Sequence, residues 1–320
     1  MPSWAFVAWH LTAAAVWAAD PSYRYFEGRD TSGHPVVLGY SEDLPREYSA
    51  QDVLKSAAEW DPFNAGSNFF TLKLTKTSNC LEDSSVNTNG AWCLDTQNRK
   101  HVNLANDQSY YVPPFHVPAD DIIAKVLLDM LGRDGSSLND FGAGVGQYGH
   151  YLLSQDPTIR YRGYDGASNV ESVTNGFVQW FDLTVPLSLP VADWVISLEV
   201  GEHIPHKDEM NYVRNLHAHS CRGIIISWGN VLQGGHGHIN NHRWSYIRDL
   251  FVELDYELDR ELSDRMQAID IRKARSSDGT ATHHLRSQGE NQDYMHAYPW
   301  LWKTVVFRRR EPRTDGPCAP

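Results

Sequence analysis

The chain has 320 residues, with 28 lysines and arginines against 40 aspartates and glutamates, a formal net charge of −12. This acidic balance argues against broad electrostatic binding to nucleic acid or to an anionic membrane surface. A hydrophobic fraction of 41% supports a packed core and excludes a wholly disordered chain, while four cysteines are too few for a small disulfide scaffold and lack the spacing of a CxxC zinc site. The length predicts one large domain, or one domain with a substantial appendage.

The first 18 residues form an apolar segment without lysine or arginine. The segment is short for a membrane span of about 20 residues, and Val16 and Ala18 place small residues at the −3 and −1 positions of a cleavage site. We therefore expect residues 1–18 to be a secretory signal peptide, no stable membrane span, and a mature protein that is secreted or in the secretory lumen. Because no basic residue precedes the apolar run, an uncleaved anchor and an N-terminal helix packed on a cytoplasmic protein remain the alternatives.

Residues 19–118 are expected to form an irregular front region, because Pro, Gly, Ser and Asn cluster along it. One helix is predicted over residues 49–60, with Ser49 as its N-cap. The segment YYVPPFHVP, residues 110–118, is interrupted by proline and is predicted to link the front region to the body.

The four cysteines divide into a predicted pair and two single thiols. Cys80 and Cys93 flank one polar loop of turn-forming residues, and a secretory location would permit them to form a disulfide. Cys221 precedes an apolar, strand-like run and is expected to be a buried thiol. Cys318 lies in a tail of Pro and Gly and is expected to be free.

From Ala119 onward, short apolar runs alternate with helical patterns, which indicates βαβ units and a mostly parallel sheet. The predicted helices are 119–131, 146–155, 206–220 and 240–255. The predicted strands are 137–141, 159–166, 177–183, 192–200, 223–229 and 303–309. We therefore predict an α/β fold over residues 119–310, a doubly wound, Rossmann-like sheet with helices on both faces, followed by a loose tail over 311–320. Such sheets bind ligands outside the carboxyl ends of their strands.

The first predicted strand of this body ends in a glycine cluster, DFGAGVGQYG, residues 140–149. Glycines let the backbone turn tightly and approach a ligand ahead of a helix N-terminus. Gly144, Gly146 and Gly149 spell G-x-G-x-x-G, the dinucleotide fingerprint. Read from Asp140, the same segment spells D-x-G-x-G-x-G, which resembles the cofactor loop of the seven-stranded S-adenosylmethionine-dependent methyltransferases. The loop alone leaves both cofactors open.

Three aspartates follow three successive predicted strands. Asp165 ends the second strand, where a carboxylate can accept both ribose hydroxyl hydrogens. Asp182 follows the third strand, where this methyltransferase class often places an acidic residue near the adenine amine. Asp140 would repel a pyrophosphate but attract the ammonium group of S-adenosylmethionine. Each aspartate alone fits a turn or an N-cap equally well, but their ordered placement favours S-adenosylmethionine as the cofactor.

The next segments make this resemblance more specific. SLEVGEHIP, residues 197–205, resembles the fourth-strand motif of the class, while SWG and QGGHGHIN, residues 227–229 and 233–240, resemble the methyltransferase-like 24 type, an animal group within the class. The resemblance covers about residues 119–310, and less closely the stretch Trp92-Cys93-Leu94 before them, and implies an S-adenosylmethionine-dependent methyltransferase. The cofactor-binding residues that it implies are Asp140, Gly142, Ala143, Gly144, Gly146, Asp165, Gly166, Phe181, Asp182 and Glu199.

Methyl transfer from a sulfonium is an in-line displacement, and a base assists an oxygen or nitrogen nucleophile that carries a proton. The ends of the fourth and fifth strands should flank the methyl group, and their catalytic candidates are Glu199, Glu202, His203, His236 and His238. For Glu202 and His203, capping a turn or satisfying backbone groups is an equally open interpretation. His236, His238 and His242 also have a spacing that permits a metal, but no carboxylate or cysteine accompanies them, so we expect no metal.

Two functions of other classes remain open. The G-x-G-x-x-G spacing permits an NAD-dependent oxidoreductase. The secretory start permits a non-catalytic secreted binding protein that retains the methyltransferase fold, since a fold alone does not establish activity. The sequence does not identify the methyl acceptor, a small molecule or a protein, or the oligomeric state. A nucleic-acid partner is not expected, because no basic, aromatic-lined surface is evident.

Overall fold

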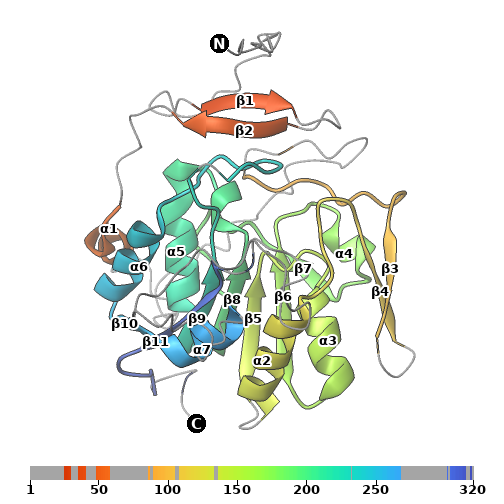
Figure 1. The fold of residues 1–320 in the computed structure, drawn as a ribbon. Coiled ribbons are helices and arrows are strands. Elements are labelled where there is room, and N and C mark those ends of the chain that lie inside the picture. The colour runs from red at the N-terminus through yellow and green to blue at the C-terminus, as the bar shows by residue number, and fades with distance from the viewer. Residues whose placement is uncertain are drawn as a thin grey trace, which may run out of the picture.

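The computed structural model describes residues 25–29, 35–40, 48–57, 86, 89–104, 108–132, 136–231, 233–267, 301, 303–314 and 318 (Figure 1). The predicted signal peptide over residues 1–18 lies outside these ranges. Among the helices of the described ranges, none combines the length and the apolar character that crossing a membrane requires.

A seven-stranded sheet forms the centre of the molecule (Figure 1). In spatial order its strands are β10 (Tyr256–Leu258), β11 (Val305–Arg309), β9 (Ser220–Ser227), β8 (Ala192–Leu198), β5 (Ser137–Phe141), β6 (Arg160–Asp165) and β7 (Val178–Trp180). The five strands from β9 to β7 pair in parallel, whereas β11 pairs antiparallel with both β9 and β10. The predicted doubly wound, mostly parallel α/β fold is confirmed.

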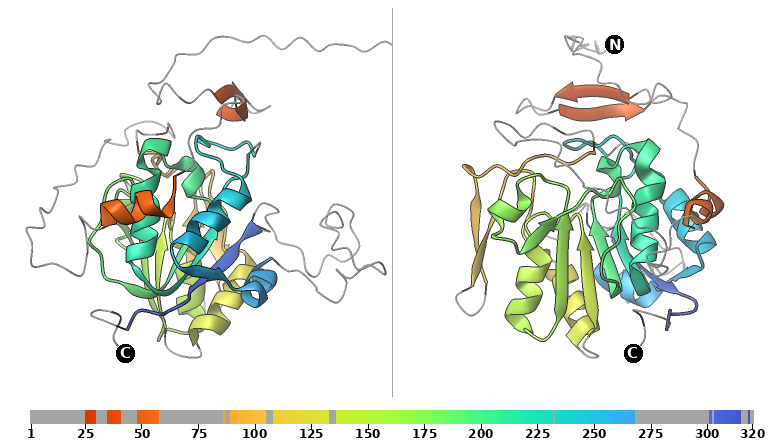
Figure 2. Two further views of the ribbon diagram at one scale, coloured as in Figure 1. Left: turned by 90° about the vertical axis from the view of Figure 1, so that its left-hand side faces the viewer. Right: turned by 180° about the vertical axis from the view of Figure 1, so that it is seen from behind.

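Helices cover both faces of this sheet, as the two turned views show (Figure 2). One face packs against α2 (Asp121–Gly132), α3 (Gln147–Gln155) and α7 (Arg260–Met266). The other face packs against α1 (Ala50–Ala57), α5 (Glu209–Ala218) and α6 (Trp244–Glu253). A short helix, α4 (Val170–Val173), connects β6 to β7.

The continuous apolar runs of the strands follow from this double covering. In β9, Ile224 and Ile226 join the cluster beneath α5 and α6, while Ile225 between them joins the cluster beneath α2 and α3. A strand that is buried on both faces has no solvent side on which to place polar residues. The runs GIIIS and DWVIS therefore lack the polar alternation of a half-exposed strand.

The first described helix begins as the sequence predicts. The Ser49 hydroxyl accepts a hydrogen bond from the Asp52 N–H at 3.3 Å, and the Asp52 carboxylate accepts one from the Ser49 N–H at 2.9 Å. The two residues thereby cap the first turn reciprocally, in addition to the bond from the Asp52 N–H to the Ser49 carbonyl at 3.0 Å.

Two short antiparallel ribbons lie in the front region. They are β1 (Tyr25–Arg29) with β2 (Pro35–Tyr40), and β3 (Lys100–Asn103) with β4 (Ser109–Val112). In β4, Tyr110 and Val112 are buried in a third apolar cluster with Val145 and Trp180, whereas Tyr111 is exposed. Strand β4 of the front region is therefore packed against the start of α3 and the end of β7.

The disulfide pattern corrects two expectations. Cys221, at the start of β9, is bonded to Cys318 with their Cα atoms 5.6 Å apart, so neither is a free thiol. The Arg313 N–H donates to the Cys221 carbonyl at 3.0 Å, which brings the tail back along β9. The two cysteines are 97 positions apart in the sequence, and no local pattern of residues indicates that the tail meets β9. Cys93 is also disulfide-bonded, and its predicted partner Cys80 lies outside the described residues.

Candidate functional site

A cavity of about 420 Å³ lies at the carboxyl ends of β5, β6 and β8. This is the edge at which open α/β sheets bind their ligands. The strand ends and the loops that follow them contribute Gly142, Gln147, Tyr148, Asp165, Gly166, Leu198, Glu199, Val200, His203, Gln233, His236 and His238 to its lining. The front region contributes Asn89, Gly90, Ala91, Trp92, Phe115, His116 and Val117.

The glycine loop meets the cavity at Gly142, and the backbone there requires glycine. Gly142 has φ +79°, a left-handed conformation, and a Cβ there would lie 2.3 Å from Cγ2 of Val200. The N–H groups of Gly142 and Ala143 both donate to the Tyr164 carbonyl, at 2.8 and 3.0 Å. The loop is therefore anchored to β6, with a bare backbone toward the ligand space.

Asp165 is placed at the cavity, where the sequence predicts a ribose contact. Its Oδ2 accepts a hydrogen bond from the Gly144 N–H at 2.8 Å, and its Oδ1 accepts one from the Ala167 N–H at 2.8 Å. Each carboxylate oxygen has two lone pairs, so each can accept one further donor. Burial raises the pKa of Asp165, while hydrogen bonds and the neighbouring His116 oppose that rise.

The other two aspartates of the predicted set face elsewhere. Asp140 accepts a hydrogen bond from the Tyr161 hydroxyl at 2.8 Å, and burial raises its pKa to about 7. Asp182 holds a turn, because its Oδ1 accepts from the N–H and the hydroxyl of Thr184, at 2.9 and 2.6 Å. Neither residue lines the cavity.

The predicted cofactor residues thus divide between the lining and its support. The lining contains Gly142, Asp165, Gly166 and Glu199. Ala143 is buried in the cluster beside β7, and Phe181 packs against Tyr164 with ring centroids 5.4 Å apart. Gly144 donates to Asp165, and Gly146 caps the N-terminus of α3.

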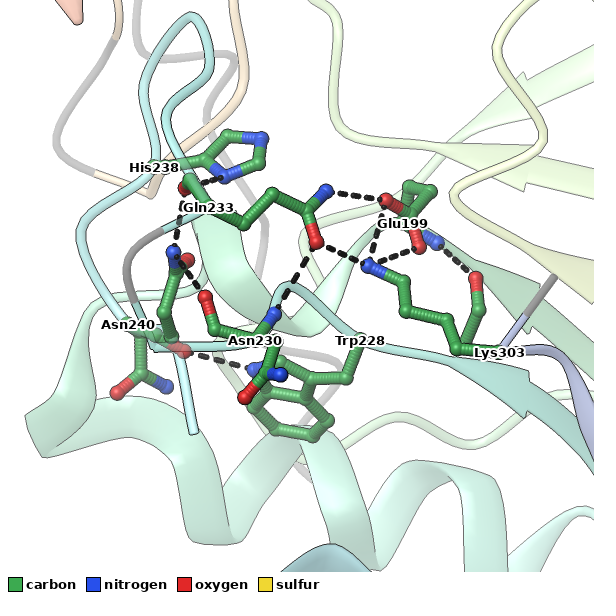
Figure 3. A network of polar contacts seen from close by, with 9 residues as sticks. Glu199, Trp228, Asn230, Gln233, His238, Asn240 and Lys303 are labelled. Carbon is green, nitrogen blue, oxygen red and sulfur yellow. Dashed lines mark hydrogen bonds and ion pairs between the residues drawn. The ribbon is translucent and has the colours of Figure 1, made fainter. Parts of the chain in front are cut away.

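Glu199 connects the end of β8 to the loop after β9 (Figure 3). Its Oε2 accepts hydrogen bonds from Gln233 and from Lys303, both at 3.0 Å. Burial, together with the nearby carboxyl of Glu202, raises the pKa of Glu199 to about 7. Lys303 also donates to Oε1 of Gln233, so the side chains of Glu199, Gln233 and Lys303 form one network.

Four histidines share the cavity with one tryptophan. The ring of Trp92 lies 5.7 Å from His116, 5.1 Å from His203 and 5.0 Å from His236, between ring centroids. His203 and His238 are themselves in edge contact at 4.9 Å. Burial lowers the pKa of His116 and holds that of His203 well below its ordinary range. The sequence predicts His203, His236 and His238 here, but its local pattern does not indicate Trp92 or His116.

His236, His238 and His242, whose spacing in the sequence permits a metal site, do not form one cluster in the structure. His242 is turned to Glu209, with its Nε2 2.7 Å from Oε2, rather than to the cavity. Asn240 and Tyr246 also donate to the Glu209 carboxylate. Burial alone would raise the pKa of Glu209, but His242 and the hydrogen bonds hold it well below its ordinary value. This cluster joins α5, α6 and the loop after β9.

No protein-family model and no curated protein sequence matches the chain. Solved structures that it resembles include magnesium protoporphyrin IX methyltransferase from Synechocystis PCC 6803 with bound SAM, at 14% identity and a TM-score of 0.36, over 58% of this chain and 77% of that one. YcgJ from Bacillus subtilis is similar at 11% identity and a TM-score of 0.37, over 59% and 98%. An O-methyltransferase family 2 protein from Planctomyces limnophilus is similar at 16% and 0.32, over 42% and 51%. The fold assignment stands on the strand order of the sheet.

Proposed function

We propose that the chain is an S-adenosylmethionine-dependent methyltransferase that acts on an oxygen or nitrogen nucleophile. The observation that carries the proposal is Asp165, a carboxylate with unused lone pairs at the end of β6, beside the bare backbone of Gly142. A nucleoside at this edge of the sheet would place its two ribose hydroxyls as donors to Asp165.

The charge of the lining disfavours a dinucleotide. Asp165 and Glu199 line the cavity, and its described lining contains no lysine or arginine. Lys303 lies outside the lining and is paired with Glu199, so the remaining acidic side chain of the lining is Asp165, which repels a pyrophosphate and attracts a cofactor with sulfonium and ammonium groups. The antiparallel β11 between β9 and β10 also departs from the six-stranded order of the dinucleotide fold.

The chemistry requires an aligned nucleophile and an acceptor for its proton. When bound, S-adenosylmethionine supplies a methyl group activated by its sulfonium. The acceptor's oxygen or nitrogen forms the new bond to carbon as the carbon–sulfur bond breaks, and the electron pair stays on sulfur. His203, His236 and His238 line the cavity at the ends of β8 and β9 and are the candidate bases for the released proton.

We also propose that the protein works in the secretory pathway or outside the cell. The apolar start of the chain supports this location, and so does the bond between Cys221 and Cys318, because such disulfides persist in oxidising compartments.

The test is a titration of three purified proteins with S-adenosylhomocysteine: the wild type, Asp165→Asn, and Asp182→Asn as the matched control. We expect saturable binding that Asp165→Asn weakens by about 10-fold or more, the value of hydrogen bonds to a charged group. Asp182→Asn keeps the acceptor for Thr184 and should bind as the wild type does. Absence of binding to folded protein, or preferential stabilisation by NAD, would overturn the proposal.

A further inference from the structure

We propose that Glu202, His203 and His238 form a site for a divalent transition-metal ion beside the cavity. This set differs from His236, His238 and His242, the histidines whose spacing in the sequence permits a metal. Its existence does not depend on methyl transfer. Each of the three residues offers one ligand atom, and these atoms lie within 4.8 Å of one another. Zinc bonds of about 2.1 Å place tetrahedral ligands about 3.4 Å apart, so modest side-chain movement would close the site.

Glu202 supplies the first independent observation. Its side chain is fully buried, and neither carboxylate oxygen has a partner at full hydrogen-bond geometry among the described residues. Burial raises the pKa of Glu202, and the nearby Lys303 and the backbone of Gly229 only oppose that rise. An ionised carboxylate that is removed from water without a partner costs several kcal/mol, and buried charges in proteins are accordingly paired or bound to metals. A cation between Glu202 and the two imidazoles would supply that partner.

The two histidines supply the second observation. Nδ1 of His203 lies 3.1 Å from the Gly237 carbonyl, and Nδ1 of His238 lies 3.1 Å from the Gln233 carbonyl. A carbonyl only accepts hydrogen bonds, so both imidazoles carry their proton on Nδ1 and have the lone pair on Nε2. Metal-binding histidines are typically oriented in this way, with the other nitrogen donating to a backbone carbonyl.

The loop that carries His238 is held in place by neighbouring side chains (Figure 3). Asn241 donates to the same Gln233 carbonyl at 2.7 Å, and the Gln233 side chain is tied to Glu199 and Lys303. These contacts fix the carbonyl that orients His238, which is the support a metal ligand requires.

A second cluster of the same composition provides the contrast. His206, His242 and Asn240 donate to Oε2 of Glu209, and Tyr246 donates to its Oε1. That carboxylate is satisfied by protein donors on both oxygens, so its cluster is explained without an ion. The Glu202 carboxylate has no such set of protein donors, so a bound ion would account for its burial.

The donor set indicates the class of metal. Two imidazoles and one carboxylate are a zinc set that leaves a fourth position open, and they also suit other first-row transition metals, whereas Mg²⁺ prefers oxygen ligands throughout. His203 and His238 both line the cavity, so an open position would face the ligand space, and with a metal bound His236 remains as the candidate base.

The experiment titrates chelator-treated, full-length protein with Zn²⁺ by calorimetry, alongside Glu202→Gln, His238→Asn and His236→Asn. We expect one saturable site in the wild type and a loss of affinity of at least about 100-fold in Glu202→Gln and His238→Asn, since even outer-shell changes cost 10- to 100-fold. His236→Asn alters a histidine of the same loop outside the ligand group and should bind Zn²⁺ as the wild type does.

A second measurement separates metal binding from folding. Without metal, Glu202→Gln should melt no lower than the wild type, because it removes an unpaired buried charge, while its melting temperature should no longer rise with Zn²⁺. Wild-type protein without saturable Zn²⁺ binding, or equal affinity in Glu202→Gln, would overturn the site. Titration of the same samples with S-adenosylhomocysteine reports separately on the proposed function.

Discussion

The buried carboxyl of Asp140 offers a direct test of the electrostatics beneath the glycine loop. Asp140 is 4% exposed, and the Tyr161 hydroxyl is its hydrogen-bond donor at 2.8 Å. Burial raises its pKa from 3.8 to about 7. Between these two values the folded protein retains a proton that the unfolded chain has released. Raising the pH through this window therefore destabilises the wild type, and Asp140→Asn, which has no such proton, is free of the effect.

The magnitude follows from the shift in pKa. About three pKa units at 1.36 kcal/mol each correspond to about 4 kcal/mol over the whole window. Between pH 5 and pH 8, the free energy of unfolding of Asp140→Asn should rise relative to the wild type by about 3 kcal/mol. Tyr161→Phe removes a hydrogen bond that lowers the pKa of Asp140, so in that background the difference should continue to grow above pH 7.

The assay is urea unfolding of the wild type and Asp140→Asn at several pH values, with one slope m shared by both proteins. A difference in unfolding free energy that stays constant from pH 5 to pH 8 would refute the reasoning, because it would mean that Asp140 ionises in the folded protein as it does in the unfolded chain.

Two further predictions concern the backbone of the glycine loop and the tail. Gly142→Ala should lower the melting temperature and weaken S-adenosylhomocysteine binding more than Gly176→Ala does. The two glycines have nearly equal φ, +79° and +78°, but only a Cβ at Gly142 would collide with Val200. Equal effects of the two substitutions in thermal and binding assays would contradict this. Cys318→Ser should lower the free energy of unfolding by about 2 to 5 kcal/mol, since it opens a loop of nearly 100 residues. A reducing agent should remove the difference between this variant and the wild type, and a difference that persists would count against the role of the bond.

Features that depend on neighbours in sequence were predictable. The N-cap at Ser49, the strands that are buried on both faces, and the tight glycine turn at Gly142 all follow from local patterns of a few residues. Asp165 was predictable for a related reason, since the end of a strand next to the glycine-loop strand must meet the same edge of the sheet.

Features that depend on contacts between segments far apart in the chain were not predictable from the sequence. Trp92 and His116 come from the front region and reach a cavity that is built on strands over 20 residues further along the chain. Asp140, Asp165 and Asp182 are equivalent in the sequence, yet only Asp165 faces the ligand space. Asp140 pairs with Gly163, two residues before Asp165 along β6, and Asp182 lies two residues beyond Trp180, the partner of Asp165, so the three carboxylates stand at different depths along the strand ends.

The sequence by itself determined the alternation of strands and helices, the glycine turn and the residue types at the edge of the sheet, because these depend on propensity, periodicity and backbone freedom within short windows. Only the tertiary structure decided that Cys221 meets Cys318, that β11 enters the sheet antiparallel, and that His242 pairs with Glu209 while His238 stays beside Glu202. Those outcomes depend on the packing of segments that are far apart in the chain, and local sequence does not encode which of several compatible partners a side chain meets.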